Sequence, residues 1–192
     1  MTDQELADRF NYPNGTLKNK LGITDATDLA RREFQIVNEN AIALLRHANE
    51  LPKIREIDQL NRVHRFLFDE VYEWAGEVRD YNLTKGNHFF QDFQTFREAA
   101  SWINSLLDNA NQNDQIAASA YAELLDNINE YHPFREGNGR STKVFLQLLA
   151  LQHHQYLNFP RHQDKLVAGF NQDGPIDYQA LGQLLNVQDL DQ

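Results

Sequence analysis

The sequence predicts an all-α fold, a bundle of helices around one central buried helix with a small β-hairpin beside it. Three observations predict it. Apolar residues recur at helical spacing along most of the chain. One run, at residues 144–151, is apolar in nearly every direction around a helical wheel, as a buried helix is. Helical spacing breaks at about 77–94, where a glycine-containing turn separates two segments that favour strands.

Length and composition fit a single domain spanning residues 1–192, with 41% hydrophobic residues to build its core. The net charge is −10, from 18 Lys+Arg against 28 Asp+Glu. That balance argues against direct nucleic-acid binding, because phosphate neutralisation needs clustered basic residues. The absence of cysteine excludes disulfides and metal–sulfur sites, and no apolar run is long enough to span a membrane. The acidic, polar N-terminus is not a secretory signal, so we expect a cytoplasmic protein with no membrane partner.

The first half of the chain contains an arm and two helices. Residues 1–24 form an N-terminal arm with a Tyr-Pro-Asn-Gly turn signal. A first helix is predicted from Thr24 or Asp25, either of which suits an N-cap, to about Asn49. A second helix is predicted from about 57 to 74, before the glycine stop that Ala75-Gly76 provides.

The hairpin and the later helices follow. Lys85 and Gly86 lie at the tip of the predicted hairpin, within about 77–94. Further helices are predicted at about 95–107, 115–131 with Asp114 as N-cap, 162–171 and 176–186, the last two separated by the breaker at 173–175.

Three histidines outside the central stretch favour ordinary roles. His64 lies on the apolar face of the second helix, which favours packing over catalysis. His153 and His154 are adjacent, so they point about 100° apart on a helix. With no carboxylate nearby in sequence, they are interpreted as surface residues rather than metal ligands.

The chemically richest stretch runs over residues 131–151 and reads YHPFREGNGRSTKVFLQLLAL. It places a polar loop at the start of the central helix, where free backbone N–H groups and the helix dipole favour phosphate. Gly137 and Gly139 allow the backbone to approach a ligand, and Asn138 and Arg140 add side-chain donors. These residues predict an anion-binding loop.

A base and a metal ligand accompany this loop. His132 has an ordinary pKa of about 6.5, which suits a proton acceptor at neutral pH. Glu136 offers hard oxygen atoms, which suit Mg²⁺ held partly by substrate phosphates. A lone His-Pro usually indicates only a turn, and a lone Gly-x-Gly is weak evidence for a binding site. Here the base, the metal ligand, the phosphate donors and the helix start all fall within nine residues. Their co-occurrence favours a catalytic site at residues 132–140.

The string HPFREGNGRSTK resembles the signature of the Fic family, HPFx(D/E)GNGRxxR, at every specified position except the last, where Lys143 replaces arginine. The segment 11–33 more loosely resembles the N-terminal lead-in of bacterial Fic toxins. The resemblance implies the Fic fold and a nucleotidyltransferase that, with Mg²⁺, transfers AMP from ATP to a hydroxyl of a target protein. Lys143 keeps the charge but loses the bidentate fork of arginine.

The resemblance also implies a role for each matching residue. It assigns the base to His132, the Mg²⁺ ligand to Glu136, nucleotide binding to Gly137, Asn138, Gly139, Arg140 and Lys143, the loop anchor to Phe134, and a target-docking flap to the hairpin with Lys85 and Gly86 at its tip.

Many Fic proteins carry an inhibitory helix with the pattern (S/T)xxxE(G/N). Residues 119–123 read SAYAE, but Leu124 follows, and the segment falls in a predicted core helix. The resemblance therefore favours the toxin of a toxin–antitoxin pair, with a small antitoxin supplying a glutamate to Lys143. It also implies a target inside the producing cell, with type II topoisomerase subunits as candidates.

Two alternatives stay open. The chain could be a nucleotide- or protein-binding module that has lost transfer, although the intact His132 and Glu136 speak against this. It could also use another nucleotide or a phosphate-containing carrier, because the loop's donors face phosphate and do not select a base.

Overall fold

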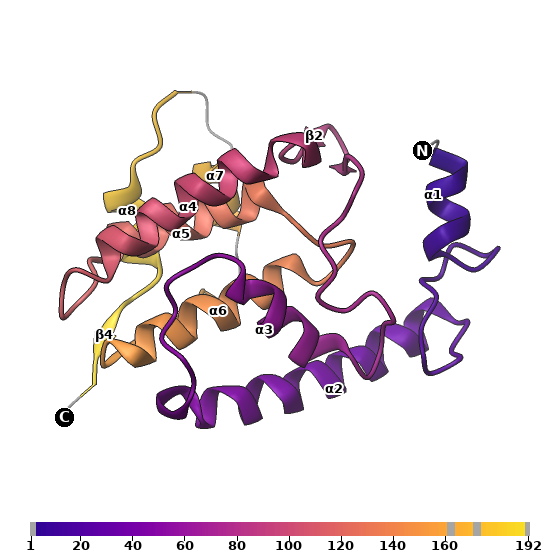
Figure 1. The fold of residues 1–192 in the computed structure, drawn as a ribbon, viewed down its shortest axis with the longest axis horizontal. Coiled ribbons are helices and arrows are strands. Elements are labelled where there is room, and N and C mark those ends of the chain that lie inside the picture. The colour runs from indigo at the N-terminus through magenta and orange to yellow at the C-terminus, as the bar shows by residue number, and fades with distance from the viewer. Residues whose placement is uncertain (1–2, 161–163, 171–173, 191–192) are drawn as a thin grey trace.

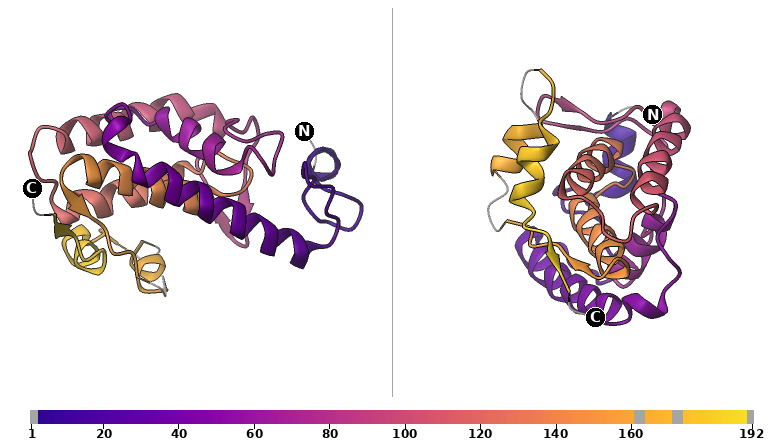
Figure 2. Two further views of the ribbon diagram at one scale, coloured as in Figure 1. Left: turned by 90° about the horizontal axis from the view of Figure 1, so that it is seen from below. Right: turned by 90° about the vertical axis from the view of Figure 1, so that its left-hand side faces the viewer.

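The computed structural model describes residues 3–160, 164–170 and 174–190. Within these ranges the chain is mostly helical, and helix α6 (Asn138–Gln152) lies in the middle of the bundle (Figures 1 and 2). The end-on view in Figure 2 shows α5 (Ala118–Tyr131) beside α6, with the other long helices around them. The predicted all-α class with one small hairpin is confirmed.

Helix α2 (Ala26–Arg46) begins where the sequence predicts, because the Asp25 side chain accepts hydrogen bonds from the amides of Thr27 and Asp28, both at 2.9 Å. It ends slightly earlier than predicted, and a short 3₁₀ turn, η1 (Ala48–Glu50), follows it. The arm before it contains a helix that the sequence did not predict, α1 (Asp3–Phe10).

Helix α3 (Gln59–Phe68) ends six residues before the predicted end at Trp74. The residues after it form turns, and adjacent Val71 and Tyr72 are both fully buried. A continuing helix would point these neighbours about 100° apart, whereas the turn lets both enter the core. Gly76, with φ +77°, closes this turn rather than the helix itself.

The predicted hairpin is present and very short. Strand β1 (Thr84–Lys85) pairs antiparallel with β2 (His88–Phe89), around Gly86 at φ +60°. A 3₁₀ turn, η2 (Phe93–Thr95), leads into α4 (Phe96–Ala110).

Helix α5 begins later than predicted. Its N-cap is Ala117, with no side-chain cap bond, so the expected cap at Asp114 is wrong. The helix ends at Tyr131, as expected, and leads directly into the polar loop.

The core surrounds α6, whose apolar residues are buried on all sides as predicted. Its buried hydroxyls are satisfied within the helix: Ser141 donates to the Gly137 carbonyl at 3.0 Å and Thr142 to the Asn138 carbonyl at 2.9 Å. The largest fully buried side chains include Tyr72, Tyr121, Phe68, Phe134, Phe145, Leu60 and Leu67. This core fixes the start of α6, and with it the loop.

The C-terminal part differs most from expectation. Helices α7 (Asp164–Phe170) and α8 (Tyr178–Leu184) replace the predicted 162–171 and 176–186, and residues 161–163 and 171–173 lie outside the described ranges. Strand β3 (Gln155–Tyr156) pairs antiparallel with β4 (Gln188–Asp189), a pairing that the sequence did not predict. None of the helices in the described ranges is both long and apolar enough to cross a bilayer.

Candidate active site

The predicted catalytic loop connects α5 to α6, and two left-handed residues shape it. His132 caps α5 with φ 42° and ψ 59°, and Gly137 precedes α6 with φ 82°. Positive φ is ordinary for glycine but costs energy for histidine. The loop therefore turns sharply at both ends, and one of the turns is at the predicted base.

The Asn129 carbonyl determines which nitrogen of the His132 imidazole carries the proton. Its Nδ1 lies 2.9 Å from the Asn129 carbonyl oxygen, which can only accept, so Nδ1 carries the proton and Nε2 is the free acceptor. Burial lowers the pKa of His132 to about 4, against the opposing effect of this hydrogen bond. At neutral pH the ring is therefore neutral, with one unshared acceptor nitrogen, as a general base must be.

A ring from the hairpin covers His132. Phe90, directly after β2, stacks on the imidazole with ring centroids 3.6 Å apart and an interplanar angle of 14°. The Phe90 amide donates to the Leu83 carbonyl at 3.2 Å, which keeps Phe90 at the base of the hairpin. The hairpin and the predicted base are thus in direct contact.

Asn138 closes the loop on itself. Its Oδ1 accepts from the Phe134 amide at 2.9 Å, and its Nδ2 donates to the Phe134 carbonyl at 2.8 Å. The side chain is 5% exposed, so both of its polar groups are committed to this brace. The Asn138 side chain therefore braces the loop, while the backbone amide of Asn138 precedes the first helical hydrogen bond of α6.

His64 contacts the loop from the core and binds its backbone. It is fully buried, as the packing interpretation predicted, and its ring stacks on Phe134 at 3.8 Å. Its Nδ1 accepts from the Gly76 amide at 2.8 Å, so Nε2 carries the proton and donates to the Glu136 carbonyl at 3.0 Å. Burial lowers the pKa of His64 to about 4, which keeps this neutral tautomer in place. Phe134, itself fully buried, is positioned as the expected loop anchor.

The start of α6 has the features of an anion site. The first helical hydrogen bond runs from the Ser141 amide to the Gly137 carbonyl at 3.0 Å, so the amides at 138–140 precede it and have no helical acceptor. A Cβ at Gly137 would lie 2.5 Å from the Phe68 ring, whereas one at Gly139 would meet nothing within 4 Å. The backbone at 139 therefore borders open space.

Glu136 is half exposed, with a side-chain exposure of 52%. Its Oε1 accepts from the Gly137 amide at 2.9 Å and lies 3.5 Å from an Arg140 nitrogen. No cluster of three or more metal-ligating side chains occurs in the described ranges. A single accessible carboxylate still fits Mg²⁺, which is usually held by one or two carboxylates together with substrate phosphates.

Arg140 forms the main ion pair of the site. Its Nη1 donates to Oε1 of Glu33, a buried carboxylate on α2, and its guanidinium lies 4.8 Å above the Phe68 ring. The Tyr72 hydroxyl donates to the other Glu33 oxygen. Burial and the Glu33 carboxylate raise the pKa of Tyr72, so this hydroxyl remains a donor. Arg140 is thereby fixed at the edge of the loop, with part of its side chain still exposed.

Lys143 lies one turn further along α6. Its ammonium is 5.9 Å from the centre of the Phe159 ring, and burial lowers its pKa. Within the described ranges it makes no hydrogen bond or salt bridge.

The remaining predicted site residues, Lys85 and Gly86, are exposed at the hairpin turn. The fold thus gathers His132, Glu136, Gly137, Gly139 and Arg140 around one loop, while the hairpin meets that loop through Phe90 rather than through its tip.

Sequence reasoning missed three residues that contact the site: Glu33, Phe90 and Arg79, whose Nε donates to the His132 carbonyl at 2.8 Å. Glu33 had a signal, because it lies four residues after Leu29 and four before Val37, on the buried stripe of α2. A charge on an apolar stripe indicates a buried partner. Arg79 and Phe90 follow no periodic pattern and could not be singled out.

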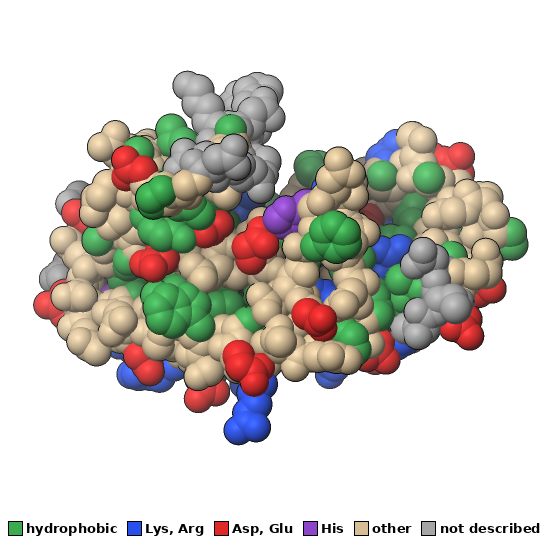
Figure 3. All heavy atoms as spheres, turned by 90° about the horizontal axis from the view of Figure 1, so that it is seen from above, with side chains coloured by type: hydrophobic (Ala, Val, Ile, Leu, Met, Phe, Trp, Pro, Cys, Tyr) green, Lys and Arg blue, Asp and Glu red, His purple; other side chains and the backbone are tan. Residues whose placement is uncertain are grey.

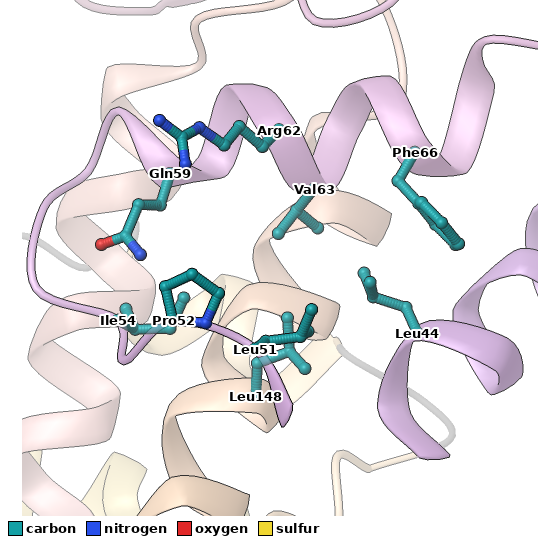
Figure 4. A pocket seen from close by; sticks show the side chains of 9 residues that line it. All are labelled: Leu44, Leu51, Pro52, Ile54, Gln59, Arg62, Val63, Phe66 and Leu148. Carbon is teal, nitrogen blue, oxygen red and sulfur yellow. The ribbon is translucent and has the colours of Figure 1, made fainter. Parts of the chain in front are cut away.

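Other hollows lie away from these groups. An apolar groove of about 200 Å³ is lined by residues of α2, α3, α6 and the segment between the first two, including Leu44, Phe66 and Leu148 (Figure 4). None of its lining residues belongs to the 132–143 segment. On the face seen in Figure 3, acidic side chains lie among uncharged ones, and a histidine side chain is visible near the middle. Fewer basic than acidic side chains are visible there, in keeping with the acidic composition.

Comparison with known proteins gives a consistent result. The sequence model of the Fic/DOC family matches residues 55–150. A probable protein adenylyltransferase of Sinorhizobium fredii, y4lH, is 31% identical over 171 residues, which cover 84% of this chain and 82% of that protein. The protein adenylyltransferase VbhT of Bartonella schoenbuchensis is 28% identical over 77% of this chain. This chain spans only 31% of the length of VbhT.

The fold also matches solved structures. The crystal structure of the BepC protein of Bartonella tribocorum, with bound AMPPNP, has a TM-score of 0.79 to this structure at 21% identity. The match covers 96% of this chain and 98% of that one. At this level of identity the similarity concerns the fold.

Proposed function

Because the chain belongs to the Fic/DOC family, we propose that it is a protein adenylyltransferase that transfers AMP from ATP to a hydroxyl side chain of a target protein. The single observation that carries the proposal is the neutral His132 ring, with Nε2 as its acceptor nitrogen, in the same loop that leads to the open amides at the start of α6. The relatives' names and the AMPPNP bound to BepC support ATP as the donor.

The chemistry follows from these groups. The target hydroxyl gives its proton to Nε2 of His132 as its oxygen attacks the α-phosphorus of ATP. A new phosphorus–oxygen bond forms, the bond between the α-phosphorus and the bridging oxygen breaks, and pyrophosphate leaves. A positioned base contributes about 10²–10⁴-fold to such a reaction.

The loop supplies the anion site in this proposal. The amides at 138–140 and the guanidinium of Arg140 face the phosphates, and Lys143 extends the site along α6. Mg²⁺ held by Glu136 would add positive charge that stabilises the phosphates and the leaving pyrophosphate. The exposed hairpin offers free backbone groups for pairing with an extended target segment.

The test is transfer of label from α-labelled ATP. We expect the wild-type protein to label a target, with mass spectrometry finding an added AMP on a Ser, Thr or Tyr, and we expect His132→Ala to fold and bind ATP without transferring label. Equal labelling by the two proteins would remove the base assignment. Binding of ATP without any transfer by the wild type would favour the alternative, a binding module.

We also propose that the protein is the toxin of a toxin–antitoxin pair, with a target inside the producing cell and type II topoisomerase subunits as the first candidates. Support comes from residues 119–123, which form part of α5 and lack the residue that would complete an inhibitory motif. Expression should arrest growth, His132→Ala should not, and co-expression of the neighbouring reading frame should relieve the arrest. Arrest that persists with His132→Ala would contradict this role.

A further inference from the structure

Arg79 occupies a buried junction between the hairpin and the catalytic loop. It lies in the segment between α3 and β1 and is 5% exposed. Its guanidinium donates to three backbone carbonyls: Nε to His132 at 2.8 Å, Nη1 to Tyr81 at 2.5 Å and Nη2 to Gln91 at 2.6 Å. Two of these acceptors flank the hairpin, and the third belongs to the predicted base.

The chemistry of this contact makes it geometrically demanding. Within the described ranges Arg79 forms no salt bridge, so carbonyl oxygens and the Phe96 ring, 4.6 Å away, compensate its buried charge. A buried charge without a carboxylate partner is costly unless its donors are satisfied. The guanidinium is a rigid planar fork, so three carbonyls bound to it are held at fixed relative positions.

Arg79 also supports the strained backbone at His132. A left-handed histidine costs energy and persists only where its surroundings hold it. Here Arg79 binds the His132 carbonyl through its side chain and the Pro133 carbonyl through its own amide, at 2.8 Å in both cases. The consecutive carbonyls of His132 and Pro133 are therefore both fixed by one residue.

The hairpin reaches the same point from its other end. The Gln91 amide donates to the Glu130 carbonyl at 3.0 Å, and the Phe90 ring stacks on His132. The base of the hairpin and the end of α5 are therefore joined by backbone hydrogen bonds, by a ring stack and by the Arg79 guanidinium.

We propose that Arg79 is a positioning residue that couples the hairpin to His132, so that the segment that receives the target and the base that activates it keep one relative geometry. This rests on the proposed function for its consequence in catalysis. Arg79 itself touches no reacting atom, and it acts through the backbone of its neighbours.

The experiment compares Arg79→Lys and Arg79→Met with the control Arg97→Met, which removes an exposed arginine at the start of α4. Lysine keeps the charge but not the three-way fork, so it tests geometry even if the methionine variant folds poorly. Amide hydrogen exchange is measured over 82–92 and 126–135, ATP affinity by calorimetry, and kcat and KM on the labelled target. In Arg79→Lys we expect exchange in both segments to rise together by about tenfold.

For catalysis, we expect the Lys variant to lower kcat by about 100-fold and to raise KM for the target, because small misplacements of a base cost about this much. ATP affinity should stay within about twofold of wild type, since the amides at 138–140 are not bound by Arg79. The Arg97→Met control should match wild type in every measurement.

Three results would overturn the proposal: faster exchange in only one of the two segments, an unchanged kcat in Arg79→Lys, or a loss of ATP affinity parallel to the loss of kcat. The last result would make Arg79 a general support of the fold. If the wild type transfers no label, the proposed function fails, and the exchange measurements alone then decide whether Arg79 couples the two segments.

Discussion

Glu33 and Arg140 form an ion pair between the buried face of α2 and the first turn of α6, and the Tyr72 hydroxyl occupies the second Glu33 oxygen. The pair joins residues 107 positions apart, so α2 orients a predicted phosphate-binding side chain from outside the loop. The arginine is held in place before any nucleotide arrives.

Replacing this carboxylate by an amide should weaken the protein and the site together. In Glu33→Gln the charge is lost and one oxygen must serve both former partners. We expect the free energy of unfolding to fall by about 1–3 kcal/mol, measured in urea, with weaker ATP binding. Glu39→Gln, exposed on the same helix, is the control and should change neither. An unchanged stability in Glu33→Gln would mean that the pair contributes nothing net.

Two glycines in the loop should respond differently to alanine. Gly137 has φ 82°, and a Cβ there would lie 2.5 Å from the Phe68 ring, so Gly137→Ala should lose about 1–3 kcal/mol of stability and also ATP binding. Gly139 is helical, with open space where a Cβ would lie, so Gly139→Ala should keep or gain up to about 1 kcal/mol. It should still bind ATP less well, because the methyl group enters the space next to the amides. Calorimetry on both variants checks this, and normal ATP affinity in Gly139→Ala would move the phosphates elsewhere.

Stability should decline as the pH falls from about 6.5 to 4. Burial lowers the pKa of His64 from 6.5 to about 4, so in this window the unfolded chain binds a proton that the folded chain does not. The stability is complete above 6.5 and decreases on acidification by about 3 kcal/mol from this residue. His64→Gln, which can still donate to Glu136, should make the curve of urea-unfolding free energy against pH less steep, and the slope that remains comes from His132, whose pKa burial also lowers to about 4.

We expect the Lys143 side chain to strengthen the binding of ATP, which has three phosphates, and to contribute little to the binding of AMP, which has one. Its ammonium makes no polar contact in the described ranges and lies a turn beyond the loop, where the resemblance to Fic proteins expects the terminal phosphate. Lys143→Met should weaken ATP binding by about tenfold or more while changing AMP binding little. Lys143→Arg should tighten ATP binding through its bidentate fork. Equal losses for ATP and AMP in Lys143→Met would place the lysine near the α-phosphate or only in packing.

The effect of Mg²⁺ on ATP binding should show whether Glu136 is a ligand of the ion. We expect Mg²⁺ to strengthen ATP binding by the wild type, chelation to reverse this, and Glu136→Gln to bind ATP equally with and without Mg²⁺. Glu77→Gln, exposed in the turn after α3, should keep the Mg²⁺ response. A full Mg²⁺ response in Glu136→Gln would remove Glu136 as the ligand.

The sequence predicted most of the local structure of this site, but few of the long-range contacts that hold the site in place. The run 144–151 identified the central helix because a helix that is buried on all sides has apolar residues on all sides, which can be seen in the sequence. The HPF-to-GNGR string located the loop and the predicted base for a similar reason, since those residues are adjacent in the chain.

The long-range contacts were not predictable in the same way. Nothing in the sequence indicates that the side-chain amide of Asn138 pairs with the backbone of Phe134. Arg79 lies 53 residues from the carbonyl that it binds, in a segment without periodicity. The strands β3 and β4 are two residues each, too short to produce an alternating pattern.

The closing pair of strands has a consequence for biosynthesis. Strand β4 pairs with β3 just after the central helix, and α8 packs on α5, the helix that leads into His132. While the ribosome is still making residues before 178, that face of α5 has no cover, and the nascent chain exposes the apolar surface that α8 will bury. The helix pair around the catalytic loop can therefore reach its final packing only after α8 has been synthesised.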